Sequence, residues 1–306
     1  MSTPPGFVPP DPSLIGAVPA PPFAKVPDPG RLFELRAQRL AALAVGHPLA
    51  PYLDFLAGLV RLQHHILADL PDLDPLDGET LERAHGFAMP ALDRTRFTPD
   101  TAFEATLTRL LDQARALPKP DAAEAALTQV RDASPAARDD MVRNVLADSL
   151  PMEALAEHVY VAAALQVHFA RLASRLDETR LTDVGQGACP CCGGPPVASL
   201  IVDWPTIAGA RYCACALCGT LWNHVRVRCV LCGSTKGIGL QEVEGSSGAV
   251  KAETCDTCQG YVKVMYQAKD SLVEPVADDV ATAGLDLLMR TGPYRRGAFN
   301  PFLLGY

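Results

Sequence analysis

The chain has 306 residues, of which 48% are hydrophobic and 20% charged; this is the composition of a globular protein and excludes a disordered one. Its formal net charge of -8 weighs against a general nucleic-acid binder, because such proteins are usually basic. No apolar run reaches the roughly 18–20 residues of a membrane span, and the first residues lack the basic start and apolar block of a secretory signal. We therefore expect a cytoplasmic protein without membrane insertion, whose ten cysteines are reduced rather than paired in disulfides.

Residues 1–27 are predicted to form a proline-rich arm. Ten prolines fall within residues 1–29, and each proline fixes φ and removes a backbone donor. Such a segment forms neither a helix nor a central strand. We expect an extended arm lying on the body of the protein, and docking to a partner is the less favoured interpretation.

Residues 28–182 are predicted to form an all-α helical domain. Apolar residues recur at about one helical turn, and breakers such as Pro48 and Pro151 separate the segments. Segments of this kind, with almost no alternating pattern, are typical of a helical bundle. Helices are expected from Pro29 to before His47, and over 49–70, 79–85, 99–117, 121–132, 135–148 and 151–176.

After residue 183 the pattern changes to glycines, cysteines and β-branched residues. Three short strands are predicted there, at 197–202, 220–227 and 261–266. The last part, residues 271–306, is predicted to contain one helix over 275–289, which packs back on the body, and an irregular tail.

The cysteines form a tandem repeat. Eight of the ten make four Cys-x-x-Cys pairs, and adding 40 to each number of the first four gives the second four. Glycine follows three of the pairs directly, whereas Gln259 follows the last one, so the last turn is expected to differ slightly. The first four are Cys189, Cys192, Cys215 and Cys218, and the second four are Cys229, Cys232, Cys255 and Cys258.

Two Cys-x-x-Cys turns brought together by a hairpin supply four thiolates in a tetrahedron. The spacing therefore predicts two tandem rubredoxin-like or zinc-ribbon modules, at 183–224 and 225–270. Cys191 and Cys213 are left over and are expected to be free thiols packed beside a metal site. The predicted fold class is multidomain α and β, with the helical domain followed by these two modules.

The spacing leaves the identity of the metal open. Four sulfur ligands suit zinc and iron about equally, and zinc is favoured because structural four-cysteine zinc sites are common. A site closed by four protein ligands leaves no position for a substrate, so we expect no catalytic residues and no enzyme activity. The chain also lacks a phosphate loop, a Gly-x-Ser-x-Gly motif and a dinucleotide fingerprint.

Zinc ribbons often bind nucleic acid, but the charge of this region disfavours that function. Residues 185–270 contain seven Lys or Arg against six Asp or Glu, and four-thiolate sites add negative charge. We therefore expect no nucleic-acid partner.

Several motifs resemble those of the formate dehydrogenase accessory protein FdhE family. The likeness reaches the N-terminal helices and covers nearly the whole chain, except the arm and the extra Cys191 and Cys213. The resembling motifs are Cys189-Pro-Cys-Cys-Gly, Arg211-Tyr-Cys-Ala-Cys-Ala-Leu-Cys, Trp222-Asn-His-Val-Arg-Val-Arg-Cys-Val-Leu-Cys-Gly, Lys251-Ala-Glu-Thr-Cys-Asp-Thr-Cys, Tyr261-Val-Lys-Val-Met-Tyr-Gln-Ala-Lys-Asp, Asn300-Pro-Phe-Leu and Pro48-Leu-Ala-Pro-Tyr-Leu-Asp-Phe.

The resemblance implies a cytoplasmic maturation factor for respiratory formate dehydrogenase. Such a factor acts on the molybdenum- and selenium-containing catalytic subunit before its export, and its Cys-x-x-Cys motifs bind iron. Carried over to this chain, each group of four cysteines would hold one iron ion, so the resemblance moves the expected metal from zinc to iron. The alternative function is a rubredoxin-like protein that donates or accepts an electron during that maturation.

Overall fold

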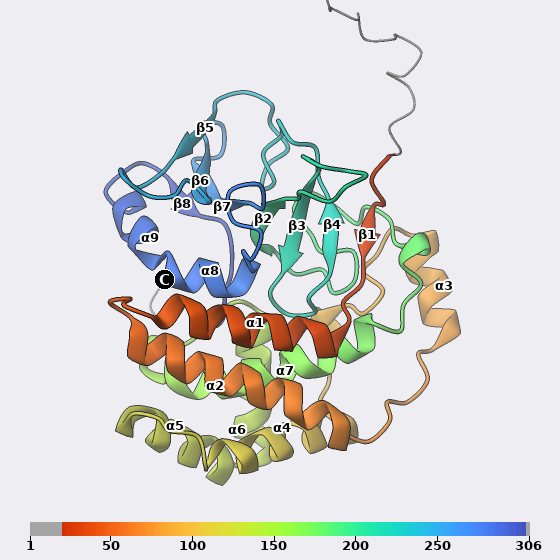
Figure 1. Ribbon diagram of the computed structural model, residues 1–306. Coiled ribbons are helices and arrows are strands. Elements are labelled where there is room, and N and C mark those ends of the chain that lie inside the picture. Colours follow the sequence, from red (N-terminus) through yellow and green to blue (C-terminus); the bar gives the residue numbers. More distant parts are fainter. Residues whose placement is uncertain (1–19, 304–306) are drawn as a thin grey trace, which may run out of the picture.

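Figure 1 shows the computed structural model, which describes residues 20–303. It is a mixed helical and sheet structure: a layer of helices lies on one side, and a sheet with two short helices lies on the other. The first 19 residues of the predicted arm lie outside the described residues. Among the described helices, none has the length and apolar character needed to cross a bilayer.

Between Pro29 and Arg180 the described residues form helices and no strand. Whether they are a separate domain, with the predicted boundaries at 28 and 182, stays a prediction. The helices are α1 Pro29–Ala44, α2 Ala50–Ile66, α3 Gly78–Gly86, α4 Thr101–Ala114, α5 Asp121–Asp132, α6 Pro135–Leu146 and α7 Leu155–Ala173, with single 3-10 turns at Leu67–Asp69, Arg94–Arg96, Met152–Ala154 and Glu178–Arg180.

Side-chain caps begin several of these helices. The carboxylate of Asp28 accepts a hydrogen bond from Arg31 N, and that of Asp100 accepts one from Phe103 N at 2.7 Å. The α7 helix is buried on nearly all sides from His158 to Ala170, and it packs against α2, α4, α5 and α6. It is therefore the central helix of this region.

The strands form one eight-stranded sheet with the order β1-β4-β3-β2-β7-β6-β5, and β8 pairs with β7. The strands are β1 Ala24–Lys25, β2 Pro196–Ile201, β3 Arg211–Cys215, β4 Leu221–Asn223, β5 Ile238–Gln241, β6 Val250–Cys255, β7 Gly260–Tyr266 and β8 Arg295–Arg296.

The sheet repeats the 40-residue period of the cysteines. The β2-β3-β4 meander and the β5-β6-β7 meander are both antiparallel, and each carries one group of four cysteines. The meanders join through β2 and β7, which run parallel with Leu200 opposite Met265. The first repeat therefore has a neighbouring strand on both sides, β1 and β7, whereas β5 of the second repeat is an outer strand among the described residues.

Two expectations about this half of the chain need correction. Strands β3, β5 and β6 were not among the three that the sequence predicts, because cysteine, glycine and charged residues interrupt their alternation. The single helix expected over 275–289 is two helices, α8 Pro275–Ala281 and α9 Ala283–Met289. The break follows from Lys263, whose ammonium donates hydrogen bonds to the carbonyl oxygens of Asp279 and Thr282 at 2.8 and 3.1 Å.

Long-range contacts tie the ends of the chain to this body. The last part of the arm forms β1, which pairs with β4, and the hydroxyl of Tyr212 donates to Pro22 O at 2.9 Å. Helix α8 packs on α1, as Figure 1 shows, with a buried ion pair of 3.0 Å between Arg36 and Glu274.

Candidate metal centre

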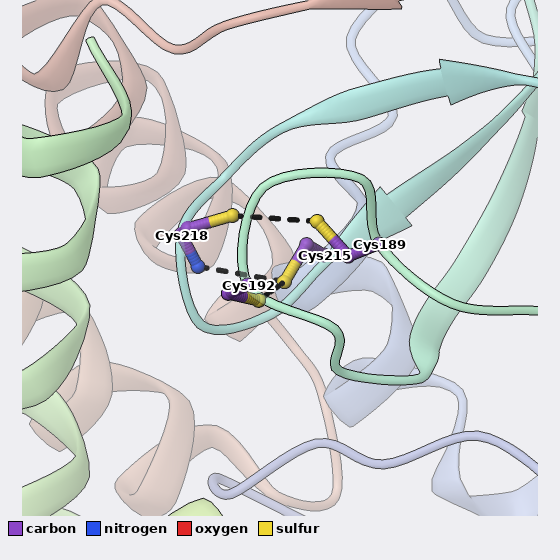
Figure 2. A group of neighbouring side chains, drawn as sticks. All are labelled: Cys189, Cys192, Cys215 and Cys218. Atoms are coloured by element: carbon purple, nitrogen blue, oxygen red, sulfur yellow. Dashed lines mark hydrogen bonds between the residues drawn. The ribbon is translucent and has the colours of Figure 1, made fainter. Parts of the chain in front are cut away.

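The first centre consists of Cys189, Cys192, Cys215 and Cys218, whose side chains point toward one another in Figure 2. The first two lie in the turn before β2, and the other two lie at the end of β3 and in the turn after it. The sulfur–sulfur distances are 3.6 Å between Cys189 and Cys218 and 3.4 Å between Cys192 and Cys215. All four residues are buried.

The second centre consists of Cys229, Cys232, Cys255 and Cys258, in the equivalent turns around β5 and β6. Its sulfur–sulfur distances are 3.9 Å between Cys229 and Cys258 and 3.7 Å between Cys232 and Cys255. Cys232 and Cys258 are exposed to solvent, whereas the other two are buried. The structure thus brings the eight predicted residues together in the two predicted groups.

Both groups have the dimensions of a four-sulfur metal site. The sulfurs within each group lie within 4.8 Å of one another. A metal–sulfur bond of about 2.3 Å gives a tetrahedron with edges of about 3.8 Å, close to the distances of 3.4 to 3.9 Å found here. Four soft sulfur donors in a closed tetrahedron fit zinc or iron and leave no open position.

The same backbone turn follows all four Cys-x-x-Cys pairs. The φ angles of Gly193, Gly219 and Gly233 lie between 75° and 78°, and that of Gln259 is 52°. The glycine amides close the turns, as Gly193 N does by donating to Cys189 O at 2.8 Å. Gln259 therefore adopts the left-handed conformation that glycine provides elsewhere, and the fourth turn differs in residue type rather than in backbone conformation.

Burial and neighbouring thiols shift the pKa values in opposite directions within each group. In the first centre burial raises the pKa of Cys189 well above its usual value; it acts in the same direction on Cys218, but hydrogen bonds from the other thiols hold that pKa well below its usual value. In the second centre burial raises the pKa of Cys229 to about 12, whereas backbone amides and thiols outweigh burial and lower that of Cys255 to about 7. The thiols of Cys218 and Cys255 are therefore more acidic than those of Cys189 and Cys229 in the same groups.

The helical region covers the first centre. The backbone amides of Leu92 and Arg94 donate to Cys191 O at 2.6 Å and to Cys192 O at 3.2 Å. From α7, the Gln166 side chain donates to Ala216 O at 2.9 Å. A Cβ atom on Gly219 would lie 2.5 Å from Leu32 of α1, so this helix packs directly on the turn.

The two remaining cysteines lie in different surroundings. Cys191 lies beside the first centre, where its sulfur accepts a hydrogen bond of 3.1 Å from the Thr220 hydroxyl. Cys213 faces the Ser199 hydroxyl at 3.9 Å, and burial raises the pKa of its thiol to about 11. Neither residue belongs to the groups of four.

Sequence reasoning missed Thr220 and Arg94. Thr220 also contacts the sulfur of Cys218 at 3.2 Å, and the 40-residue comparison could have singled it out, since its equivalent is Gly260. Arg94 forms an ion pair with Asp148 next to the first centre. Its position is 95 residues before Cys189, and no sequence pattern connects the two.

Comparison with known proteins assigns the chain to a family. Three family models match consecutive parts of it: FdhE N-terminal over residues 21–186, FdhE central domain over 188–226 and FdhE C-terminal domain over 227–303. An FdhE homologue from Rhizobium meliloti is 50% identical over 299 residues, covering 97% of this chain and 98% of the relative. One from Stutzerimonas stutzeri is 37% identical and covers 92% of each chain.

A solved structure is also similar. The crystal structure of the FdhE protein from Pseudomonas aeruginosa superposes with a TM-score of 0.82 at 33% identity, covering 93% of this chain and 99% of that one. Together with the relatives, this similarity extends from the helical region through both cysteine centres. The chain belongs to the FdhE family.

Proposed function

We propose that this protein is a cytoplasmic maturation factor that binds the catalytic subunit of a respiratory formate dehydrogenase before its export. Membership of the FdhE family supports the assignment to formate dehydrogenase assembly. The observation that carries the non-enzymatic role is that each cysteine group is closed by four protein thiols, which leaves no position for a substrate. The sites would keep the fold together while a separate surface binds the partner.

An apolar groove supports binding of a protein segment. It has a volume of about 770 Å³ and lies between the start of α2, the helices α8 and α9, and the loop that follows β5. Leu287 and Val243 line it and are 54% and 40% exposed. Large apolar side chains exposed around a groove are typical of an interaction site. We assign the groove to an apolar segment of the catalytic subunit.

The proposal is tested by co-purification. A tagged full-length chain is expressed with the formate dehydrogenase catalytic subunit, and the complex is quantified by size-exclusion chromatography. The proposal predicts a complex that Leu287→Glu weakens at least tenfold, because a carboxylate in the groove would have to be desolvated. Met152→Glu is the matched control, since Met152 is 69% exposed and does not line the groove. Absence of any complex with the unaltered chain would refute the function.

We propose two iron ions as the resident metals, one in each group of four cysteines, with zinc as the alternative. The four-sulfur geometry supports both metals equally, and the family resemblance favours iron. Metal analysis of anaerobically purified protein with a visible spectrum decides between them. Ferric-thiolate absorption with two irons per chain would support iron, and two zincs in a colourless protein would refute it.

The second candidate function is electron transfer during maturation. Iron bound by four thiolates supplies one-electron chemistry, and exposure of its ligands permits contact with a redox partner. The exposure of Cys232 and Cys258 favours this candidate. It predicts that the iron-loaded protein bleaches reversibly with a mild reductant and that zinc substitution abolishes maturation. Full maturation activity of the zinc protein would exclude it.

A further inference from the structure

We propose that the two centres hold their ions unequally: the first retains its ion, with Cys191 and Thr220 as positioning residues, whereas the second exchanges its ion with solvent. This inference rests on the proposed metal binding and goes beyond it. It follows from three differences between halves of the chain that the 40-residue repeat otherwise makes equivalent.

The first difference is access to the sulfurs. Cys189, Cys192 and Cys218 have no exposed surface, and Cys215 is 3% exposed. In the second centre two of the four ligands, Cys232 and Cys258, are exposed. A chelator or a competing thiol can therefore attack the second centre directly, but it reaches the first only after the structure opens locally.

The second difference is a hydroxyl between two sulfurs at the first centre. The Oγ1 atom of Thr220 lies 3.2 Å from Cys218 Sγ and 3.1 Å from Cys191 Sγ. As a metal ligand Cys218 is a thiolate and only accepts, so the Thr220 hydroxyl would donate to it while the Cys191 thiol donates to the hydroxyl. The proton that Cys218 loses goes to solvent, and the other two protons only reorient. Such outer hydrogen bonds typically change metal affinity 10–100-fold.

The second centre has no equivalent of this relay. Adding 40 converts Cys191 to Leu231 and Thr220 to Gly260. The Leu231 side chain occupies the space over Gly260, where a Cβ atom would lie 2.5 Å from its Cδ1. The position that holds a hydrogen-bond donor at the first centre therefore holds a methyl group at the second.

The third difference is which segments of the chain pack against the cysteine turns. The helical region packs on the first centre through Leu32 of α1 and Pro90, each of which would contact a Cβ atom placed on a turn glycine. At the second centre the nearest atoms to the equivalent Gly233 come from the side chains of Arg228, next to Cys229, and of Gln186, in the segment before the first centre, and neither residue lies in a helix. Opening the first centre thus requires separating the helices from the sheet.

The experiment measures metal release from the zinc-loaded full-length chain. Zinc content is first confirmed as two per chain, and excess 4-(2-pyridylazo)resorcinol is then added while absorbance is followed. We expect two phases of one zinc each, with the second at least tenfold slower. Iodoacetamide added at the end of the fast phase, followed by peptide mass spectrometry, should label the four cysteines of the second centre and spare those of the first.

The variants test the Thr220 hydroxyl, which contacts the sulfurs of both Cys191 and Cys218. Thr220→Val keeps the shape but removes the hydroxyl, and it should accelerate the slow phase about 10–100-fold without changing the fast phase. Thr220→Ser keeps a hydroxyl and should restore slow release. Cys213→Ala is the matched control, because Cys213 is equally buried but lies outside both centres, and its release should match that of the unaltered chain.

Three results would overturn the inference: release of both zincs in one phase, labelling of the first centre before the second, or a slow phase in Thr220→Val within twofold of the unaltered rate. If Thr220→Val does not fold, the phases and the labelling of the unaltered chain still decide. Zinc content below two per chain would instead refute the proposed metal binding itself.

Discussion

The two cysteine centres share their spacing, turns and strand order, but they differ in their surroundings. The first lies between the helices and the middle of the sheet, with all four cysteines buried. The second lies toward the outer strand β5, with two cysteines exposed. The geometry of the ligands is therefore local, because it depends on two short turns and a hairpin. Enclosure is not local, since it depends on elements more than 90 residues away, such as Arg94 and Leu32.

The repeats are also attached to the rest of the molecule by different forces. The first contacts the helical region through backbone hydrogen bonds and apolar packing. The second contacts α8 and α9 through buried charges: the Lys263 ammonium lies 2.5 Å from Asp286 and 3.2 Å from Asp279, and Arg296 pairs with both carboxylates at 2.7 Å. The following predictions test these two contrasts.

The largest effect is expected from removing one ligand at each centre. Cys218→Ser should lower the free energy of unfolding by about 5 kcal/mol or more, because it removes an enclosed metal on which the packing of helices against the sheet depends. Cys258→Ser should cost only about 2 kcal/mol, since the second repeat is also held by the sheet and the buried charges. Urea unfolding followed by circular dichroism in the presence of zinc measures both, and equal losses would contradict the contrast between the centres.

Lys263→Met tests the attachment of the second repeat. It leaves the fully buried carboxylates of Asp279 and Asp286 with Arg296 as their remaining cation. We therefore expect the free energy of unfolding to fall by about 3–5 kcal/mol. The control is Lys251→Met on the neighbouring strand, whose partly exposed ion pair with Glu242 should contribute less than about 1 kcal/mol. Urea midpoints measured at pH 7 compare the two variants. A similar small loss in both would show that the buried charges do not hold this repeat.

We expect His168 to make the stability of the helical region depend on pH. It lies on α7, its ring contacts Phe97 and Phe103, and among the described residues neither ring nitrogen has a hydrogen-bond partner. Burial lowers its pKa to about 4, although Asp100 opposes the shift. Between pH 6.5 and 4 the unfolded chain therefore binds a proton that the folded chain does not, so stability falls as the pH falls, by up to about 3 kcal/mol.

His168→Leu should remove this contribution. The difference in unfolding free energy between the variant and the unaltered chain, measured by urea titration at pH 7 and pH 4.5, should shift by about 2–3 kcal/mol in favour of the variant at the lower pH. His65→Leu is the control, because His65 is exposed and its replacement should leave the pH dependence unchanged. An identical pH dependence in all three proteins would refute the assignment to His168.

The smallest effect is expected at the turns. Gln259→Gly should stabilise the protein by less than about 1 kcal/mol, because it relieves a left-handed backbone at 52° but adds freedom to the unfolded chain. The matched change at the first centre, Gly219→Ala, should destabilise by about 1–2 kcal/mol, since φ is 76° and the added methyl would meet Leu32. Thermal melting measures both, and destabilisation by Gln259→Gly would contradict the equivalence of the turns.

Some helices and strands could be predicted from the local sequence pattern, and others could not. The α5 helix was expected over 121–132 and is found at Asp121–Asp132, because prolines and an apolar stripe define it locally. Strand β6 was not expected, since its residues Val250–Cys255 alternate poorly and are held by pairing with β5 and β7. The break between α8 and α9 was not expected either, because it depends on Lys263, which lies 16 residues before Asp279.

The sequence by itself determined which eight cysteines form the two groups of four, since the Cys-x-x-Cys spacing and the 40-residue repeat are visible in the order of the residues alone. The tertiary structure alone decided which centre is enclosed, that both repeats share one sheet through β2 and β7, and that Thr220 lies between Cys191 and Cys218. The physical reason is that burial and hydrogen-bond partners arise from segments far apart in the chain, whose packing no single spacing encodes.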